Sequence, residues 1–256
     1  MLKQAEAVVR AAAQLMREGA PGAVTRKEGH ANFVTEADLK VQAALEEGLT
    51  RLLPGSVVYG EEKENASIGD TPVWIVDPID GTHNYMRGLG HSAISVALAE
   101  GRKLRLGIIF NPFRDEMFTA REGGGAFLNG HPVRCSDTPF ARALSFYGTS
   151  PYNPALVRAT LEAVQELMLQ TSDVRRFGSG ALDLAYIACG RADLFFEYSL
   201  SLWDYAAGAL MVREAGGIFR LLDGDLDDLG PHGAVFASNV PCAQQALRIV
   251  ASAFPA

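Results

Sequence analysis

The most constraining feature of the sequence is a short apolar run that ends in two closely spaced acids. Residues Val73–Val76 are followed at once by Asp77-Pro78-Ile79-Asp80-Gly81-Thr82. An uninterrupted apolar run of this length is typical of a buried strand, and the Asp-Pro step predicts that the strand stops at Asp77. We therefore expect a strand in the core of the protein, with carboxylates in the turn that follows it.

Carboxylates in this arrangement are suited to binding a hard divalent cation. Mg²⁺ prefers carboxylate and carbonyl oxygens in near-octahedral geometry at roughly 2.0–2.1 Å. Asp77, Asp80 and the carbonyl of Ile79 could supply such oxygens from one tight turn. The backbone N–H groups of Gly81 and Thr82 could begin a helix and hold a phosphate at its N-terminus. The segment therefore indicates a site for a metal ion and a phosphate group.

Three further segments place acids where a helix starts or a strand stops. In residues 34–38, Thr35 and Asp38 have the spacing of a capping box at the start of a helix. The adjacent acids of Gly60-Glu61-Glu62 are equally compatible with a solvated loop. Asp204, taken alone, is typical of an acid that stabilises a helix N-terminus. Local structure is therefore a sufficient explanation for each of these segments by itself.

Hydrophobic periodicity divides the 256 residues into two regions. In the first, about residues 1–140, we predict helices over 2–18 and 35–53 and, after the strand at 73–76, an antiparallel meander of strands at 94–99, 104–110 and 116–120, which turns at 123–125 and 129–130 continue. In the second, about residues 141–256, strands and helices alternate, with strands at 143–147, 193–198, 218–222 and 234–237 and helices at 154–169, 181–188, 203–215 and 242–253. Because no repeat or long linker separates the regions, we expect one α/β domain with two sheets covered by helices.

Composition argues against several classes of function. Lysine and arginine number 23 against 30 aspartates and glutamates, so the formal net charge is −7. Nucleic-acid binding without sequence preference needs a basic surface, so direct nucleic-acid binding is not expected. There is no run of ~18 apolar residues, and the charged, amphipathic start is unlike a signal peptide, so no membrane span or secretion is expected. Three widely separated cysteines favour a reducing compartment, and we predict a cytoplasmic protein.

Motifs for other common site chemistries are absent or incomplete in the sequence. The five histidines show neither HxxxH nor paired Cys/His spacing, which argues against a zinc site. No GxxxxGK followed by Ser or Thr occurs, which excludes a P-loop nucleotide hydrolase. Gly88–Ala93 loosely matches GxGxxA but does not directly follow a strand, so we expect a loop there. Ser179 lacks the GxSxG frame of a serine hydrolase.

Taken together, the four acidic segments resemble the inositol monophosphatase family, whose motifs run GEE, WxxDPIDGTxNF and WDxAAG. The matching residues are Gly60–Glu62, Trp74–Tyr85 and Trp203–Gly208, preceded by a VTxxD element at Val34–Asp38. The similarity also covers residues 178–185 and 191–197, and therefore nearly the whole chain. It implies a single domain over residues 1–256 with the αβαβα sandwich of inositol and sugar phosphatases, usually in a homodimer.

The resemblance also implies Mg²⁺-dependent hydrolysis of small phosphomonoesters at a site that holds two to three ions. Glu61, Asp77 and the Ile79 carbonyl match the ligands of the first ion, and Asp77, Asp80 and Asp204 those of the second. A weaker third ion is expected near Glu61. Mn²⁺ is expected to substitute for Mg²⁺, and Ca²⁺ and Li⁺ to inhibit. Because the clustered acids would repel a dianionic phosphate, activity should depend on these cations.

Catalytic and substrate-binding roles follow from the same resemblance. The catalytic positions are Asp38, Glu61 and Thr82, of which Thr82 and Asp38 match the pair that orients the attacking water. Gly81 and Thr82 match the phosphate cradle, while Gly180 and Glu197 match contacts to the alcohol. The full set expected to bind substrate is Asp80, Gly81, Thr82, Gly180 and Glu197.

Three residues depart from the family pattern and leave the substrate open. His83 and Tyr85 stand where many members have Thr and Phe, and Asn32 where some have Asp. Inositol monophosphate is the preferred prediction. Fructose 1,6-bisphosphate, histidinol phosphate and a 3′-phosphonucleotide are alternatives, the last weakened by His83, where that branch typically has Lys.

Two alternatives belong to other classes of function. One is a regulatory interaction protein built on the same fold, which the complete set of carboxylates argues against. The other is a simple cation-binding protein, which would not need the phosphate cradle at Gly81 and Thr82.

Overall fold

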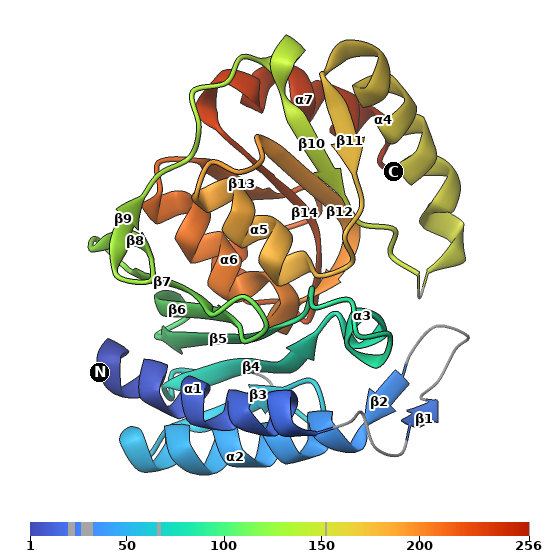
Figure 1. The fold of residues 1–256 in the computed structure, drawn as a ribbon. Coiled ribbons are helices and arrows are strands. Elements are labelled where there is room, and N and C mark those ends of the chain that lie inside the picture. The colour runs from blue at the N-terminus through green and yellow to red at the C-terminus, as the bar shows by residue number, and fades with distance from the viewer. Residues whose placement is uncertain (20–23, 27–32, 66–67, 152, 256) are drawn as a thin grey trace.

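The structure, a computed structural model, describes residues 1–19, 24–26, 33–65, 68–151 and 153–255 (Figure 1). Its helices are α1 (Leu2–Glu18), α2 (Glu36–Leu52), α3 (Thr82–Met86), α4 (Val157–Gln170), α5 (Gly180–Ala188), α6 (Leu202–Glu214) and α7 (Val240–Ala253). The predicted helices over residues 2–18, 35–53, 181–188, 203–215 and 242–253 are confirmed to within two residues at each end. None of the described helices combines the length and the apolar character needed to cross a membrane.

Two large sheets organise the described strands. The first has seven strands in the order β3 (Val57–Gly60), β4 (Val73–Asp80), β5 (Ala93–Glu100), β6 (Lys103–Asn111), β7 (Glu116–Arg121), β8 (Gly125–Leu128) and β9 (His131–Val133). The pair β3 and β4 is parallel and the following pairs are antiparallel, which confirms the predicted meander. The second has five strands in the order β11 (Asp173–Arg175), β10 (Leu144–Tyr147), β12 (Leu194–Ser201), β14 (His232–Ser238) and β13 (Ile218–Leu221).

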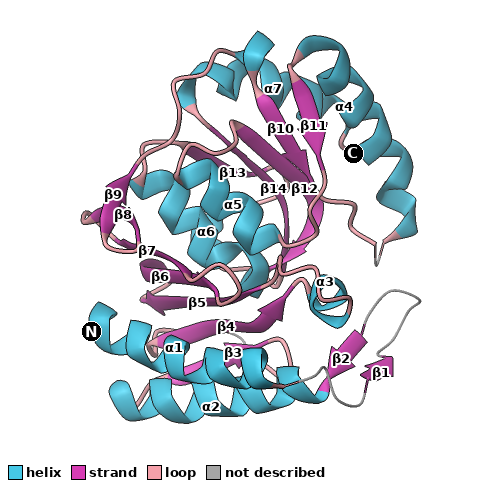
Figure 2. Cartoon of the chain, viewed as in Figure 1, coloured by secondary structure: helices cyan, strands magenta, loops and turns pink. Residues whose placement is uncertain are grey.

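Helices and sheets alternate in five layers, so the expected αβαβα fold is confirmed. Helices α1 and α2 cover the outer face of the seven-stranded sheet, α5 and α6 lie between the two sheets, and α4 and α7 cover the outer face of the five-stranded sheet (Figures 1 and 2). Helix α6 is apolar on most of its surface, as expected for a helix enclosed between two sheets. Three clusters of buried apolar side chains fill these interfaces: one lies between the seven-stranded sheet and its outer helices, one surrounds α5 and α6 and reaches both sheets, and one lies between the five-stranded sheet and its outer helices.

Four strands are not anticipated by the sequence prediction. The sequence pattern predicts no regular structure for β3, and β1 (Val24–Arg26), β2 (Phe33–Thr35) and β11 are each only three residues long. Segments this short carry too few residues for an alternating pattern to be recognised. The predicted helix at 154–169 begins as a 3₁₀ turn at Pro154–Leu156 and becomes α-helical at Val157.

The prediction that the strand at 73–76 stops at Asp77 is wrong. Strand β4 continues through Pro78 to Asp80, and its pairing with β5 is shifted on the way. Proline interrupts the hydrogen-bond ladder because it has no N–H, but its fixed φ is compatible with extended backbone at a bulge. The Asp-Pro step therefore marks an irregularity within the strand instead of its end.

Candidate active site

The irregularity in β4 determines where its two acids point. Asp77 pairs with Ser95 and Asp80 with Ala93, so three residue steps on β4 oppose two on β5. In a regular strand, residues three apart point to opposite faces of the sheet, and one extra residue brings them to the same face. The Ile79 N–H donates to Asp77 Oδ1 over 2.9 Å and so stabilises the bulge. Both carboxylates consequently line one cleft.

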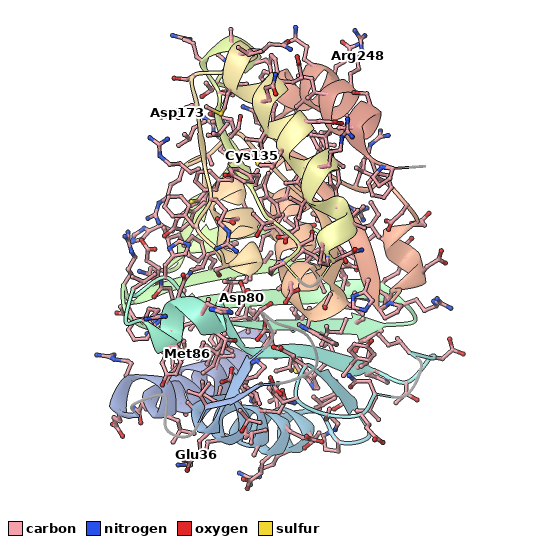
Figure 3. The ribbon with its side chains drawn as sticks, turned by 90° about the vertical axis from the view of Figure 1, so that its right-hand side faces the viewer. Glu36, Asp80, Met86, Cys135, Asp173 and Arg248 are labelled. Atoms are coloured by element: carbon pink, nitrogen blue, oxygen red, sulfur yellow. The ribbon has the colours of Figure 1, made fainter. Side chains whose placement is uncertain are left out.

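Carboxylates from three elements converge at this cleft. Oxygens of Asp77, Asp80 and Asp204, the last at the start of α6, all lie within 4.8 Å of one another. Glu61 directly follows β3, where its N–H donates to Val76 O, and its side chain lines the same cleft. We call these four acids the metal end of the cleft. Figure 3 shows Asp80 where the seven-stranded sheet meets the half of the molecule above it.

Hydrogen bonds from the second half of the chain hold two of these acids in place. Asp80 Oδ2 accepts from Ser179 Oγ at 2.5 Å and from the Ala181 N–H at 2.8 Å, both at the start of α5. Asp204 Oδ2 accepts from the Ser201 N–H at 3.0 Å, so Asp204 also closes a capping box on α6. The expected role of Asp204 at a helix N-terminus and its place beside the other acids are therefore compatible.

Burial and mutual repulsion raise the pKa values of the clustered acids. Burial, and next the charge of Glu61, holds the pKa of Asp77 well above its usual range. Burial and the neighbouring charge of Asp80 do the same for the pKa of Asp204. Burial raises the pKa of Asp80 to about 6, although hydrogen bonds from Ser179 and Ala181 oppose the shift. These carboxylates lie close together and repel one another. Their oxygens are suitable ligands for a divalent cation, whose positive charge would offset the repulsion.

The cleft encloses about 630 Å³ and extends away from these acids toward the loops of the other half. Another part of its lining consists of residues of the 148–151 and 176–180 segments, together with Glu197 of β12 and Asp183 of α5, and in it Ser179 and Gly180 adjoin Asp80 and Asp204. We call this part the loop end. Trp203 also lines the cleft, and its ring lies 5.8 Å from that of Tyr59.

Glu197 is held at the loop end by the 148–150 segment. Its Oε1 accepts from the Ser150 N–H at 2.6 Å, and Ser150 Oγ in turn accepts from the Ser199 N–H at 3.0 Å. A Cβ on Gly148 would lie 1.7 Å from Glu197 Oε2, so only glycine leaves room for this carboxylate. Burial raises the pKa of Glu197 to about 7, against the opposing effect of the Ser150 hydrogen bond. Glu197 is thus a buried acid in the cleft wall.

The turn between β4 and α3 lines the cleft as well. Gly81 has φ of +84°, and a Cβ there would lie 3.1 Å from two carbonyl oxygens, which accounts for glycine at this position. Thr82 starts α3, and its Oγ1 donates to the Ile79 carbonyl at 3.1 Å. Gly81, Thr82 and Gly180 all contact the cleft.

Asp38 occupies a different position from the other expected site residues. It is fully buried in α2, where it accepts from the Thr35 N–H at 2.7 Å and forms the predicted capping box. It is not among the residues that line the cleft. The capping role is therefore confirmed, and the catalytic role of Asp38 stays a prediction.

The departures from the family pattern have different structural consequences. The Tyr85 hydroxyl donates to the carbonyls of Met16 and Gly19, each at 3.1 Å, and so ties α3 to the end of α1 away from the cleft. His83 lines the cleft. Asn32 lies outside the described residues.

Several residues of the site escape the sequence analysis. Ser179 was considered only as a possible nucleophile, although a serine before an apolar helix is a common N-cap and its side chain here also accepts from Leu182 N. Arg176 and His232 line the cleft outside any recognisable motif, and Asp183 lines it from the stretch 178–185 that resembles the family, where no role was assigned to it. They are brought to the site by the folding of the second half of the chain.

Comparison with known proteins agrees with this geometry. The sequence matches the inositol monophosphatase family over residues 1–254. The Nus factor SuhB of Xylella fastidiosa is 38% identical over 230 residues, covering 86% of this chain and 82% of that protein. The inositol-1-monophosphatase of Mesorhizobium japonicum is 38% identical over 219 residues, covering 83% and 80%.

Solved structures give the same result. The crystal structure of the extragenic suppressor protein suhB from Bartonella henselae superposes with a TM-score of 0.89 at 34% identity, covering 97% of both chains. Sequence, fold and the cluster of carboxylates lead to one conclusion. This chain belongs to the inositol monophosphatase family, whose members are metal-dependent phosphatases.

Proposed function

We propose that this protein hydrolyses small phosphomonoesters in the described cleft, with inositol monophosphate as its main substrate. Membership of the family supports metal-dependent phosphomonoester hydrolysis. The observation that carries the proposal is the convergence of Asp77, Asp80 and Asp204 within 4.8 Å in a cleft that Gly81 and Thr82 also line. A cation-binding protein without a substrate would not need the second feature.

The acids at the metal end would hold the cations. Glu61, Asp77 and the Ile79 carbonyl would bind the first ion, Asp77, Asp80 and Asp204 the second, and Glu61 would lie near a weaker third. When bound, such ions lower the pKa of a water and offset the charge of the phosphate. We propose Mg²⁺ as the ion, with Mn²⁺ as a substitute and Ca²⁺ and Li⁺ as inhibitors, because oxygen-only ligands favour hard cations.

The residues of the chain bind and orient the reactants. We propose that the N–H groups of Gly81 and Thr82 bind the phosphate, with Asp80 beside them. Thr82 Oγ1 would orient the attacking water with the support of Asp38, which lies buried at the start of α2. Gly180 and Glu197 would contact the alcohol, since both line the same cleft as Asp80.

The test of this proposal is phosphate release from a panel of inositol, sugar, histidinol and nucleotide phosphates, with Mg²⁺ and with a chelator. We expect hydrolysis of inositol monophosphate that disappears on chelation and returns with Mg²⁺, because the acidic cleft repels phosphate until cations bind. Undiminished hydrolysis after exhaustive chelation would contradict the metal assignment. Preference for another ester in the panel would change the assigned substrate and leave the chemistry intact.

Three properties of the protein in its cell remain proposals. We propose a homodimer, which light scattering in solution would test. We also propose a cytoplasmic location on the basis of the cysteine pattern, and no direct contact with nucleic acid on the basis of the net charge of −7.

A regulatory role is the second candidate, because several similar proteins are Nus factors called SuhB. It is compatible with catalysis, since the carboxylates of the metal end are present here. Purification of partners with the wild-type chain and with the inactive Asp80→Asn variant would separate the two. A partner that binds both equally would support a role independent of hydrolysis.

A further inference from the structure

Strand β12 contains an irregularity of the same kind as the one in β4. Glu197 pairs with Val235 of β14 and Leu200 with Gly233, so three residue steps on β12 oppose two on β14. One extra residue brings side chains three positions apart to the same face of a sheet. Glu197 and Leu200 accordingly both line the cleft. The bulge in β12 therefore directs the Glu197 carboxylate toward the position proposed for the alcohol.

Ser150 bridges this bulge from the segment that follows β10, the neighbour of β12 on the side opposite β14 (Figure 1). Gly148 still continues the pairing of the sheet, since its N–H donates to the Phe196 carbonyl at 2.9 Å. Two residues later, the Ser150 N–H donates to Glu197 Oε1 at 2.6 Å, and the Ser150 hydroxyl accepts from the Ser199 N–H at 3.0 Å. Ser199 lies within the bulge, where, in the described part of the chain, no residue of β14 pairs with it. The hydroxyl thus supplies a hydrogen-bond partner that the bulge takes away from this N–H.

Ser150 adopts an unusual backbone conformation while it makes these contacts. Its φ is +42°, in the left-handed region that residues other than glycine, asparagine and aspartate seldom occupy. The residue is 1% exposed, and its neighbours Gly148 and Pro151 line the cleft. A strained residue of this kind persists where the surrounding contacts determine its conformation, which is common at functional sites. The strain and the two hydrogen bonds together indicate that Ser150 is linked to the placement of Glu197.

We propose that Ser150 is a positioning residue for Glu197. Its N–H fixes one oxygen of the carboxylate, and its hydroxyl holds the β12 bulge that directs this carboxylate into the cleft. Ser150 acts on the alcohol only through Glu197, and in this way it contributes to the selectivity for esters of polyols. The inference rests on the proposed function and adds a residue to that same site.

The test replaces Ser150 and compares hydrolysis of inositol monophosphate and para-nitrophenyl phosphate in Mg²⁺. Ser150→Ala keeps the N–H but removes the hydroxyl, so the Ser199 N–H loses its partner and the bulge loses its support. We expect kcat/KM for inositol monophosphate to fall by about fivefold to tenfold, mainly through KM, because the affected contact is remote from the reacting atoms. The values for para-nitrophenyl phosphate, whose leaving group has no polyol hydroxyl, should barely change.

Ser150→Gly provides a second variant in case Ser150→Ala does not fold. Glycine adopts positive φ without strain, and it also lacks the hydroxyl. The glycine variant should therefore have a higher melting temperature than the alanine variant and show the same loss of selectivity. Wild-type selectivity in Ser150→Gly would overturn the proposal.

A double variant separates an action through Glu197 from a general structural effect. Glu197→Gln removes the carboxylate that Ser150 is proposed to position, so adding Ser150→Ala should lower kcat/KM for inositol monophosphate little further. Additive losses in the double variant would overturn the proposal. The matched control is Ser145→Ala. Ser145 is also 1% exposed, and its hydroxyl donates to Thr171 Oγ1 at 3.2 Å outside the cleft, so this variant should leave the selectivity unchanged.

The remaining outcomes also decide the question. Equal losses on both esters in Ser150→Ala, or no loss on either, would overturn the positioning role. The same holds if Ser145→Ala changes the selectivity as much as Ser150→Ala, or if Glu197→Gln alone leaves kcat/KM for inositol monophosphate unchanged. Failure of the wild-type protein to hydrolyse either ester in Mg²⁺ would instead contradict the proposed function.

Discussion

The two ends of the cleft are built in different ways. At the metal end, Asp77 and Asp80 come from one continuous strand, and a single bulge places them on the same face. At the loop end, Gly148, Arg176 and Glu197 come from three segments that only the completed fold brings together. The pair Asp77 and Asp80 is thus a property of local sequence, whereas tertiary structure places the loop end and the other two acids of the metal end, Glu61 and Asp204. We expect changes at the metal end to abolish the reaction and changes at the loop end to alter which substrate is accepted.

The largest effect should come from the metal end. Asp80→Asn removes one charge from the cluster without changing volume, and its amide oxygen can still accept from Ser179 and Ala181. We expect turnover to fall by orders of magnitude while the near-ultraviolet circular dichroism stays unchanged, because the loss acts on cation binding. Asp70→Asn, an exposed acid outside the cleft, is the control. Activity retained with wild-type Mg²⁺ affinity would reduce Asp80 to a residue that caps α5.

The pair Thr82 and Asp38 should give a smaller loss with a distinct kinetic pattern. Thr82→Ala should lower kcat more than it raises KM, because orientation of the water matters most in the transition state. Asp38→Asn should behave alike, and the double variant should be little worse than either single one. Thr35→Ala removes the hydroxyl that accepts from the Asp38 N–H and donates to the Asp38 carboxylate, while the Thr35 N–H still donates to that carboxylate, so this variant should lower the melting temperature and change kcat little. If the losses of kcat in the two single variants add up in the double variant, Thr82 and Asp38 do not act as a pair, and the role of Asp38 is limited to capping α2.

The loop end should show selectivity instead of general loss. Glu197→Gln keeps an oxygen that can accept from Ser150 but loses the carboxylate that we propose to bind a polyol hydroxyl. A hydrogen bond to a charged acceptor is worth ~1.5–3 kcal/mol, so kcat/KM for inositol monophosphate should fall by roughly tenfold or more. Activity toward para-nitrophenyl phosphate should barely change. Equal losses of kcat/KM on both esters would show that Glu197 has a structural role. The two ends of the cleft would then not differ in the way proposed.

The smallest effect concerns stability and pH. The unfolded carboxyls lose their protons near pH 4. In the folded protein, burial raises the pKa of Asp80 to about 6 and holds the pKa values of Asp77 and Asp204 well above their usual range. In this window the folded state binds more protons, so its stability falls as pH rises. Without divalent cations, the melting temperature should therefore be lower at pH 8 than at pH 5. The decrease should be about 2–4 °C for each kcal/mol by which the free energy of unfolding falls. Calorimetry should show that Mg²⁺ reduces the difference; a difference unaffected by Mg²⁺ would argue against cation binding by these acids.

The same contrast explains how much could be predicted from the sequence. Asp77, Asp80 and the turn at Gly81 stand in one short segment whose chemistry can be recognised without a structure. The bulge could not be predicted, because an Asp-Pro step is compatible with both the end of a strand and an interruption within it. Glu61 and Asp204 were identified through the family resemblance, since local structure alone explains acids at those positions.

The loop end was predicted only in part. Gly180 and Glu197 followed from the resemblance, whereas the residues that position them did not. The need for glycine at position 148 depends on a carboxylate 49 residues later in the chain, and Arg176 lines the cleft only because of how the second half of the chain folds. Such relations depend on distances in space that periodicity and motif spacing do not encode.

The two hydrogen bonds from the start of α5 to Asp80 make catalysis a reporter of chain assembly. Asp80 belongs to the first region of the chain, and its donors Ser179 and Ala181 to the second. Two fragments made by cutting the chain near residue 140 would each contain an incomplete cleft. Neither fragment should hydrolyse phosphomonoesters by itself. If mixing them restores hydrolysis, the two regions can recognise each other without a covalent link. The rate of hydrolysis, followed by a simple colour assay, would then measure how well the two fragments associate.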